Sequence, residues 1–318
     1  MLLAGFVLSF SGGCTYETLE DACPRSLKGS RDLSEDAEAF LHRINCYRRM
    51  AQVKPGRADA GITDALQNHV DYLEANYGDS PPDNISLGAE TPGEEGFTGP
   101  DSYSRLEYVE KRLDPQYNLV LETYIFYGES DFPGLEERVD QLMADPYGRQ
   151  YMLQPGYREG GYARSESWGN FIQVLPYPDN HDVGKPRFYP GDGQRDVPPN
   201  YVHPWYYYSE TDPISYHEDI GYPITITVTD YYLPYEITME AASLEGPDGE
   251  VEVWAFGPSL ASDVLLQTLV IAPKSPLEEN STYSVTATVS HSTKSFDLEW
   301  QFTTGEWNED LTVEWYVF

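Results

Sequence analysis

The spacing of apolar residues changes near residue 185, and this change limits the chain to two differently built parts. Before it, SEDAEAFLHRINCYRRM (Ser34 to Met50) carries apolar residues at helical spacing behind a good N-cap, Ser34. After it, YPITITVTD, STYSVTATVS and SFDLEWQFTTG alternate apolar and polar residues, as half-buried strands do. The segment between is rich in Pro, Asp and Gly. We therefore predict two parts that fold separately, with a boundary near His181 to Pro186.

The first part combines helices with a strand hairpin. A second helix is predicted from Asp64 to Tyr77, stopped by Gly78, and further helices in LEYVEKRL and in GLEERVDQLMADP, the latter ended by Pro146. His69, inside the second helix, is interpreted as a packing or surface residue rather than a ligand. GYAR and WGNFIQVLPYP follow as two short strands of a hairpin.

The second part contains only strand patterns. YPITITVTD places Ile224, Ile226 and Val228 on one face and threonines on the other, and VEVWAF and LLQTLVIAP supply further strands. Several short alternating strands separated by turn signals predict an antiparallel sandwich.

The N-terminus resembles an export signal. MLLAGFVLSFSGGC has an apolar run from Leu2 to Phe10, too short for a permanent membrane span but suited to a signal peptide. The small residues before Cys14 resemble a bacterial lipobox, although Ser11 stands where such boxes usually carry leucine. We expect a secreted or cell-envelope protein, with a lipid on Cys14 as a possible membrane anchor.

The chain has three cysteines, and lipidation of Cys14 would leave Cys23 and Cys46 as a pair. An exported chain meets an oxidising compartment, so we predict a Cys23–Cys46 disulfide; two unpaired thiols are the alternative.

The charge of the chain limits its partners. Its formal net charge is −33, which repels nucleic acid and anionic membranes. An acidic surface adapted to salt is the simpler interpretation, and loose cation binding is the alternative. Forty per cent of the residues are apolar, so the chain can bury real cores.

Five segments between Ser34 and Pro178, taken in order, resemble the CAP superfamily (cysteine-rich secretory proteins, antigen 5, pathogenesis-related 1) in its bacterial form. They are NCYR, LQNHVDYL, AETPGEEGFTG, LETYIFYG and DPYGRQYMLQPGYREGGYA. The second part resembles bacterial Ig-like modules through YPGDGQRDVP, GYPITITV and PLEENSTYSVTATV…WQFTTG. The resemblance implies an α+β fold. Residues 1–33 would be a signal and N-terminal segment, 34–180 a three-layer α-β-α sandwich, and 185–318 an antiparallel all-β Ig-like sandwich.

The CAP cavity carries two histidines and two glutamates, which hold a divalent metal in some members. Here the histidine positions read Ala89 and Gly148, while Glu122 matches the first glutamate. Glu90 and Arg149 adjoin the lost histidines. The second glutamate is left open between three residues: Glu136, Glu137 and Asp140.

A cavity without its histidines makes a poor zinc site, so we expect no cofactor and no catalytic residue. One alternative is a calcium ion on oxygen ligands. The other is that Glu122 only pairs with Arg149 or another base.

Motifs of the common hydrolase and nucleotide-binding families are missing from the sequence. We therefore expect a non-catalytic surface protein that binds an extracellular protein, lipid or glycan. A hydrolase or metal-dependent enzyme using the remaining carboxylates, and a structural spacer, are the alternatives. The tyrosine-rich segments HPWYYYSE (203–210) and DYYLPYE (230–236) would either stack on ligands or cement the two parts.

Overall fold

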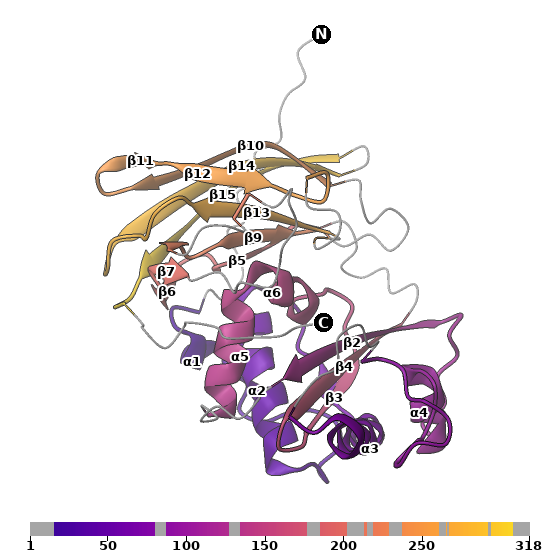
Figure 1. The fold of residues 1–318 in the computed structure, drawn as a ribbon. Helices are drawn as coiled ribbons and strands as arrows, with labels where there is room; N and C mark the ends of the chain where they lie inside the picture. The colour runs from indigo at the N-terminus through magenta and orange to yellow at the C-terminus, as the bar shows by residue number, and fades with distance from the viewer. Residues whose placement is uncertain are drawn as a thin grey trace.

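The computed structural model describes residues 16–79, 87–126, 134–176, 185–201, 213–214, 219–228, 237–260, 265, 267–291 and 294–307. Helices and strands alternate in the first part, and strands alone make up the second (Figure 1). The predicted class, a mixed fold of helices and several antiparallel sheets, is therefore confirmed.

The first part holds a four-stranded sheet in the order β1-β3-β4-β2. Its strands are β1 (Arg57–Ala58), β2 (Asn118–Phe126), β3 (Glu159–Arg164) and β4 (Trp168–Pro176). The predicted hairpin is confirmed as the antiparallel β3–β4 pair, β2 is antiparallel to β4, and β1 runs parallel to β3. The helices are α1 (Leu19–Ala22), α2 (Glu35–Met50), α3 (Ala60–Tyr77), α4 (Ser102–Tyr108), α5 (Leu135–Ala144) and α6 (Pro146–Met152).

Capping residues explain where these helices begin. The Ser34 hydroxyl accepts from the Ala37 amide at 3.2 Å, so α2 starts as predicted. The α3 helix begins four residues earlier than predicted, because the Asp59 carboxylate caps it through the Ile62 amide. Pro146 follows the end of α5, as predicted, but it also opens α6, since the first helical position needs no hydrogen-bonded amide.

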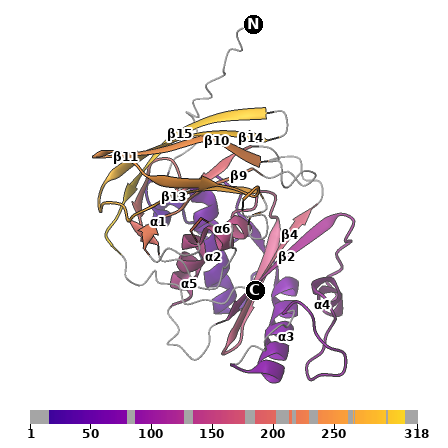
Figure 2. The same cartoon turned by 45° about the horizontal axis from the view of Figure 1, so that its top comes forward.

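Helices cover both faces of the first sheet (Figures 1 and 2). On one face, α2 packs against β3, where the Phe40 ring stacks on Tyr162 with centroids 3.9 Å apart, and α5 packs against α2. On the other face, α3 and α4 pack against Ile172 and its neighbours. Gly161 allows α3 to approach, because a Cβ there would lie 2.5 Å from the Thr63 amide nitrogen.

The second part consists of two stacked sheets and a short strand pair. The outer sheet has the order β11-β10-β14-β15-β6, the inner sheet β12-β13-β9-β5, and β7 pairs with β8. All the predicted strands form. The bounds are β5 (Arg187–Tyr189), β6 (Gln194–Val197), β7 (Asn200–Tyr201), β8 (Ile220–Gly221), β9 (Ile224–Thr227), β10 (Ile237–Gly246), β11 (Gly249–Val251), β12 (Val253–Phe256), β13 (Thr268–Pro273), β14 (Thr282–His291) and β15 (Lys294–Thr304).

The two central strands of the inner sheet, β9 and β13, are buried on both faces, which their alternating sequence did not indicate. Ile224 and Ile226 are fully buried, yet Thr225 and Thr227 are only 2% and 3% exposed. The reason is the layer order in Figure 1: the inner sheet lies between the outer sheet and the helices of the first part. Thr227 and Thr268 satisfy each other there through a 2.8 Å hydroxyl hydrogen bond.

One cluster of buried apolar residues runs through both parts, from Phe40 of α2 to Trp300 of β15. Most of the predicted boundary and both tyrosine-rich segments lie outside the described residues. Separate folding of the two parts therefore stays a prediction, and moving the two parts away from each other would expose a shared core.

Candidate functional site

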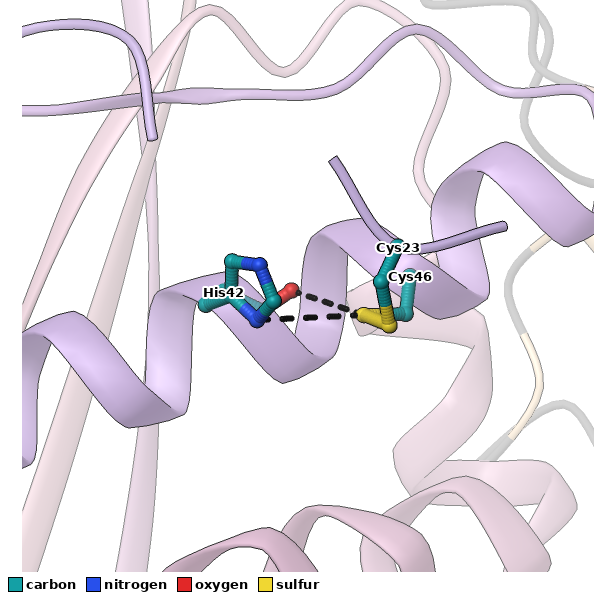
Figure 3. Close-up of side chains that lie close together, drawn as sticks. All are labelled: Cys23, His42 and Cys46. Atoms are coloured by element: carbon teal, nitrogen blue, oxygen red, sulfur yellow. Dashed lines mark hydrogen bonds between the residues drawn. A yellow bond between two sulfur atoms is a disulfide. The ribbon is translucent and has the colours of Figure 1, made fainter. Parts of the chain in front are cut away.

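The predicted disulfide is confirmed: the Cys23 and Cys46 sulfurs are 2.07 Å apart, and the bond ties the end of α1 to α2 (Figure 3). Cys14 lies outside the described residues. Among the described residues, no helix is long and apolar enough to cross a membrane.

Glu90 lies in the loop between α3 and α4, and its side chain is fully buried. Its carboxylate accepts hydrogen bonds from the Thr98 amide at 2.5 Å and the Gly99 amide at 3.0 Å. The Nδ1 atom of His69, on α3, lies 2.8 Å from the same carboxylate. Burial alone would raise the pKa of Glu90, but the hydrogen bonds from His69, Thr98 and Gly99 hold that pKa below its ordinary value. Glu90 is therefore a carboxylate.

Glu90, Glu122 and the groups that bind them form one buried cluster, and His69 is the first of its two cations. Its Nε2 atom lies 2.9 Å from the carbonyl oxygen of Leu87, which can only accept a hydrogen bond. Its Nδ1 atom faces the Glu90 carboxylate, which also only accepts. Both ring nitrogens must then donate, so the hydrogen-bond partners assign His69 as an imidazolium.

Glu122 is held by the second cation, Arg105. The side chain of Glu122 leaves β2 on the side of α3 and α4, and the Arg105 Nη2 atom lies 2.7 Å from each of its oxygens. Asn170 of β4 donates to Glu122 at 2.8 Å, and Arg105 also donates to the Gly88 carbonyl at 2.8 Å. Arg105 is 1% exposed, and the Glu122 side chain is 9% exposed. Arg105 thus ties the Glu90 loop to the sheet.

Arg105 also links the two carboxylates electrostatically, since its Nε atom is 4.0 Å from Glu90. Burial by itself lowers the pKa of Arg105, but Glu122 raises it above its ordinary value, so the guanidinium stays charged. Burial, followed by the charge of Glu122, raises the pKa of Tyr124 well above its ordinary value, so the neighbouring phenol stays protonated. Two carboxylates and two cations therefore balance in this cluster.

The cluster does not fit the divalent metal of the CAP cavity. A zinc ligand must offer a free lone pair, and both nitrogens of His69 donate to other groups. The oxygens of Glu90 and Glu122 are engaged by several donors each. Asn170 Oδ1 has no hydrogen-bond partner among the described residues, but one amide oxygen is far from the six to eight ligands of calcium. Saturated groups are also poor general bases.

The structure does not bring the remaining predicted residues into this cluster. Ala89 is exposed, although Glu90 beside it is buried. Gly148 is buried in α6, where a Cβ would lie 3.0 Å from the Leu142 carbonyl oxygen. Asp140, one candidate for the second glutamate, accepts two 2.7 Å hydrogen bonds from Arg43 on the opposite side of the sheet. Glu136 is exposed and Glu137 half-buried.

Arg149 joins the two parts of the chain and makes no described contact with Glu122. Its fully buried guanidinium donates to the carbonyls of Met143 at 2.6 Å, Ala144 at 3.0 Å and Pro223, before β9, at 2.6 Å. It lies over the rings of both Tyr189 and Tyr222, at 5.0 and 4.8 Å from their centroids. Such a site uses both the planar fork and the charge of arginine.

A groove of about 710 Å³ lies between the outer sheet, β5 and the end of α2. Phe188 and Trp300, stacked with centroids 4.2 Å apart, form part of its wall. Ala242, Ala287 and Leu298 add apolar surface. Polar lining residues include Gln52, Asp192, Asp297 and Gln301. The volume falls within the range of small-ligand sites.

No family model matches the chain. A search of the curated proteins also finds no match.

Sequence reasoning found both buried carboxylates but missed their cations. The sequence pattern indicated a packing or surface role for His69. Nothing in the pattern distinguished Arg105 from the other basic residues, of which the chain has 20 in all. One signal was present: Glu122 and Tyr124 are two residues apart on a strand and therefore share a face. Two polar groups on a buried face require partners, which could have prompted a search for a buried cation.

Proposed function

We propose that this chain is an exported, non-catalytic surface protein, in which a CAP-like domain with a degenerate cavity precedes an Ig-like module and the whole acts by binding. One observation carries the proposal: Glu90 and Glu122 are saturated by His69, Arg105 and backbone amides. The former cavity is then a structural element that holds the loop between α3 and α4 to the sheet.

The architecture of both parts supports this domain assignment. Helices on both faces of a four-stranded sheet fit the three-layer CAP arrangement. Two stacked sheets, antiparallel except for the parallel β15–β6 pair, fit an Ig-like module. Export is supported by the N-terminal apolar run and by the disulfide.

The groove favours binding over a purely structural spacer, because it offers an aromatic and apolar surface bordered by polar groups. Its ligand would be an extracellular glycan, lipid or protein segment.

Zinc titration tests the non-catalytic part of the proposal. Calorimetry on the oxidised protein should show no tight zinc site, and Glu122→Gln should give the same result. A tight site that Glu122→Gln abolishes would refute the structural role and favour the metal-enzyme alternative.

A panel of labelled oligosaccharides, apolar peptides and lipid vesicles tests the binding part. Ala242→Trp should fill the groove and remove the binding, while Ala255→Trp, an exposed site on β12 outside the groove lining, should leave it intact. Equal binding by both variants, or no binding to the whole panel, would favour the spacer.

A further inference from the structure

Cys23, His42 and Cys46 form a compact cluster where α1 meets α2 (Figure 3). His42 and Cys46 lie four residues apart on α2, and four residues bring side chains to the same helix face. Cys23 follows α1 directly. The Nδ1 atom of His42 lies 4.0 Å from the Cys46 sulfur, and all three potential ligand atoms lie within 4.8 Å of one another.

The His42 ring is held with its lone pair toward the sulfurs. Its Nε2 atom lies 2.7 Å from the Pro24 carbonyl oxygen, which can only accept, so Nε2 carries the proton. In the neutral ring, Nδ1 is then unprotonated, and Nδ1 is the atom that faces Cys46. Metal-binding histidines are commonly held by such a hydrogen bond from the other ring nitrogen.

We propose that the dithiol form of this protein binds one zinc ion through Cys23, Cys46 and His42 Nδ1, with water in the fourth position. Thiolate and imidazole ligands together suit zinc. Zinc bond lengths of about 2.3 Å to sulfur and about 2.0 Å to nitrogen put tetrahedral ligand atoms roughly 3.5–3.8 Å apart. The 4.0 Å distance from Nδ1 to the Cys46 sulfur therefore needs little change.

The larger movement falls on Cys23. The two sulfurs must separate once their bond is broken. Cys46 is buried within the long α2 helix, whereas Cys23 is only half-buried and follows a helix of four residues.

The chemistry balances with a phosphine as the reductant. The phosphine takes oxygen from water to become a phosphine oxide, while two electrons and two protons convert the disulfide into two thiols. Zinc then displaces both thiol protons into the buffer, leaving two thiolates and one neutral imidazole on the ion. Disulfide and zinc are mutually exclusive at this site. The site is separate from Glu90 and Glu122, so it does not depend on the proposed function.

Cobalt titration of the full chain in a Cys14→Ala background tests the proposal, because that background removes the third thiol. After phosphine reduction and removal of excess reductant, cobalt should give a thiolate charge-transfer band at one ion per chain, displaced by zinc. His42→Ala should weaken the affinity at least about tenfold and Cys46→Ser should abolish the band. Glu245→Gln, at an exposed site on β10 of the second part, should change nothing and serves as the matched control.

Three results would overturn the proposal: no charge-transfer band in the reduced protein, equal affinity in His42→Ala, or the same band in the oxidised protein. His42→Ala retains both cysteines, and circular dichroism of its oxidised form checks its fold. The His42→Ala result therefore tests the zinc proposal even if Cys46→Ser fails to fold.

Discussion

Replacing Arg105 by methionine should lower the free energy of unfolding by about 3–5 kcal/mol, the usual effect of removing one partner of a buried ion pair. Methionine keeps an apolar stem of similar length but no charge. Arg105 is 1% exposed and the Glu122 side chain 9%, so water has little access to replace the guanidinium. The change also removes the hydrogen bond to the Gly88 carbonyl. A loss of this size is a large share of the roughly 5–15 kcal/mol that stabilises a typical domain.

A matched double variant separates the charge effect from packing. Adding Glu122→Gln to Arg105→Met removes the unpaired carboxylate, while the new amide oxygen can still accept from Asn170. We expect the double variant to recover more than half of the loss, because neutral replacements of buried ion pairs are often nearly neutral. Arg105→Lys should be intermediate, since a single ammonium cannot reproduce the planar fork.

Urea unfolding followed by tryptophan fluorescence and circular dichroism gives the free energies, provided that the m-values agree. A loss below about 1 kcal/mol in Arg105→Met, or a double variant no more stable than the single one, would refute the reasoning. Either result would mean that Glu122 is hydrated and available to a ligand.

Three further predictions concern other parts of the chain. Glu90→Gln should cost about 1–3 kcal/mol at neutral pH. The folded-state pKa of Glu90 is below its ordinary value of 4.5, so its stabilisation is complete above pH 4.5 and is lost as the pH falls through the folded value. The deficit in urea unfolding should therefore shrink in acid, and a constant deficit would contradict this. Arg149→Met removes the guanidinium donor from three buried carbonyls, of which that of Met143 keeps the Tyr222 hydroxyl, and should speed protease cleavage between Asp179 and Gly193 severalfold; unchanged rates would mean that Arg149 does not hold the parts together. Cys14→Ala should move the protein out of the membrane fraction, and an unaltered distribution would exclude the lipobox.

Local features of this chain were predictable because nearby residues produce them. Ser34 caps α2 through the amide three residues later, and Gly78 follows α3 with a backbone φ of 55°, a conformation that glycine adopts readily. The period-two runs became β9, β14 and β15 because alternation along a strand is a property of the strand itself. The Cys23–Cys46 pairing followed from the cysteine count together with the predicted export.

The burial of individual side chains and the identity of their contact partners depended on layers that meet only in the folded chain. Thr225 alternates with isoleucine as an exposed residue would, yet it is buried because α6 and its neighbours cover the second face of the inner sheet. Arg149 was expected near Glu122, but its described contacts are with carbonyls and with aromatic rings of the second part.

The buried cluster around Glu90 and Glu122 likewise has features set by the local sequence and features set by the tertiary structure. The sequence alone determined that Glu90 follows a helix and that Glu122 points to one face of a strand. Only the tertiary structure decided which cations meet them, because His69, Arg105 and Asn170 come from three elements that α3, α4 and β4 bring to one side of the sheet. A buried carboxylate requires a partner wherever the chain supplies one, and sequence spacing does not encode which distant side chain fills that place.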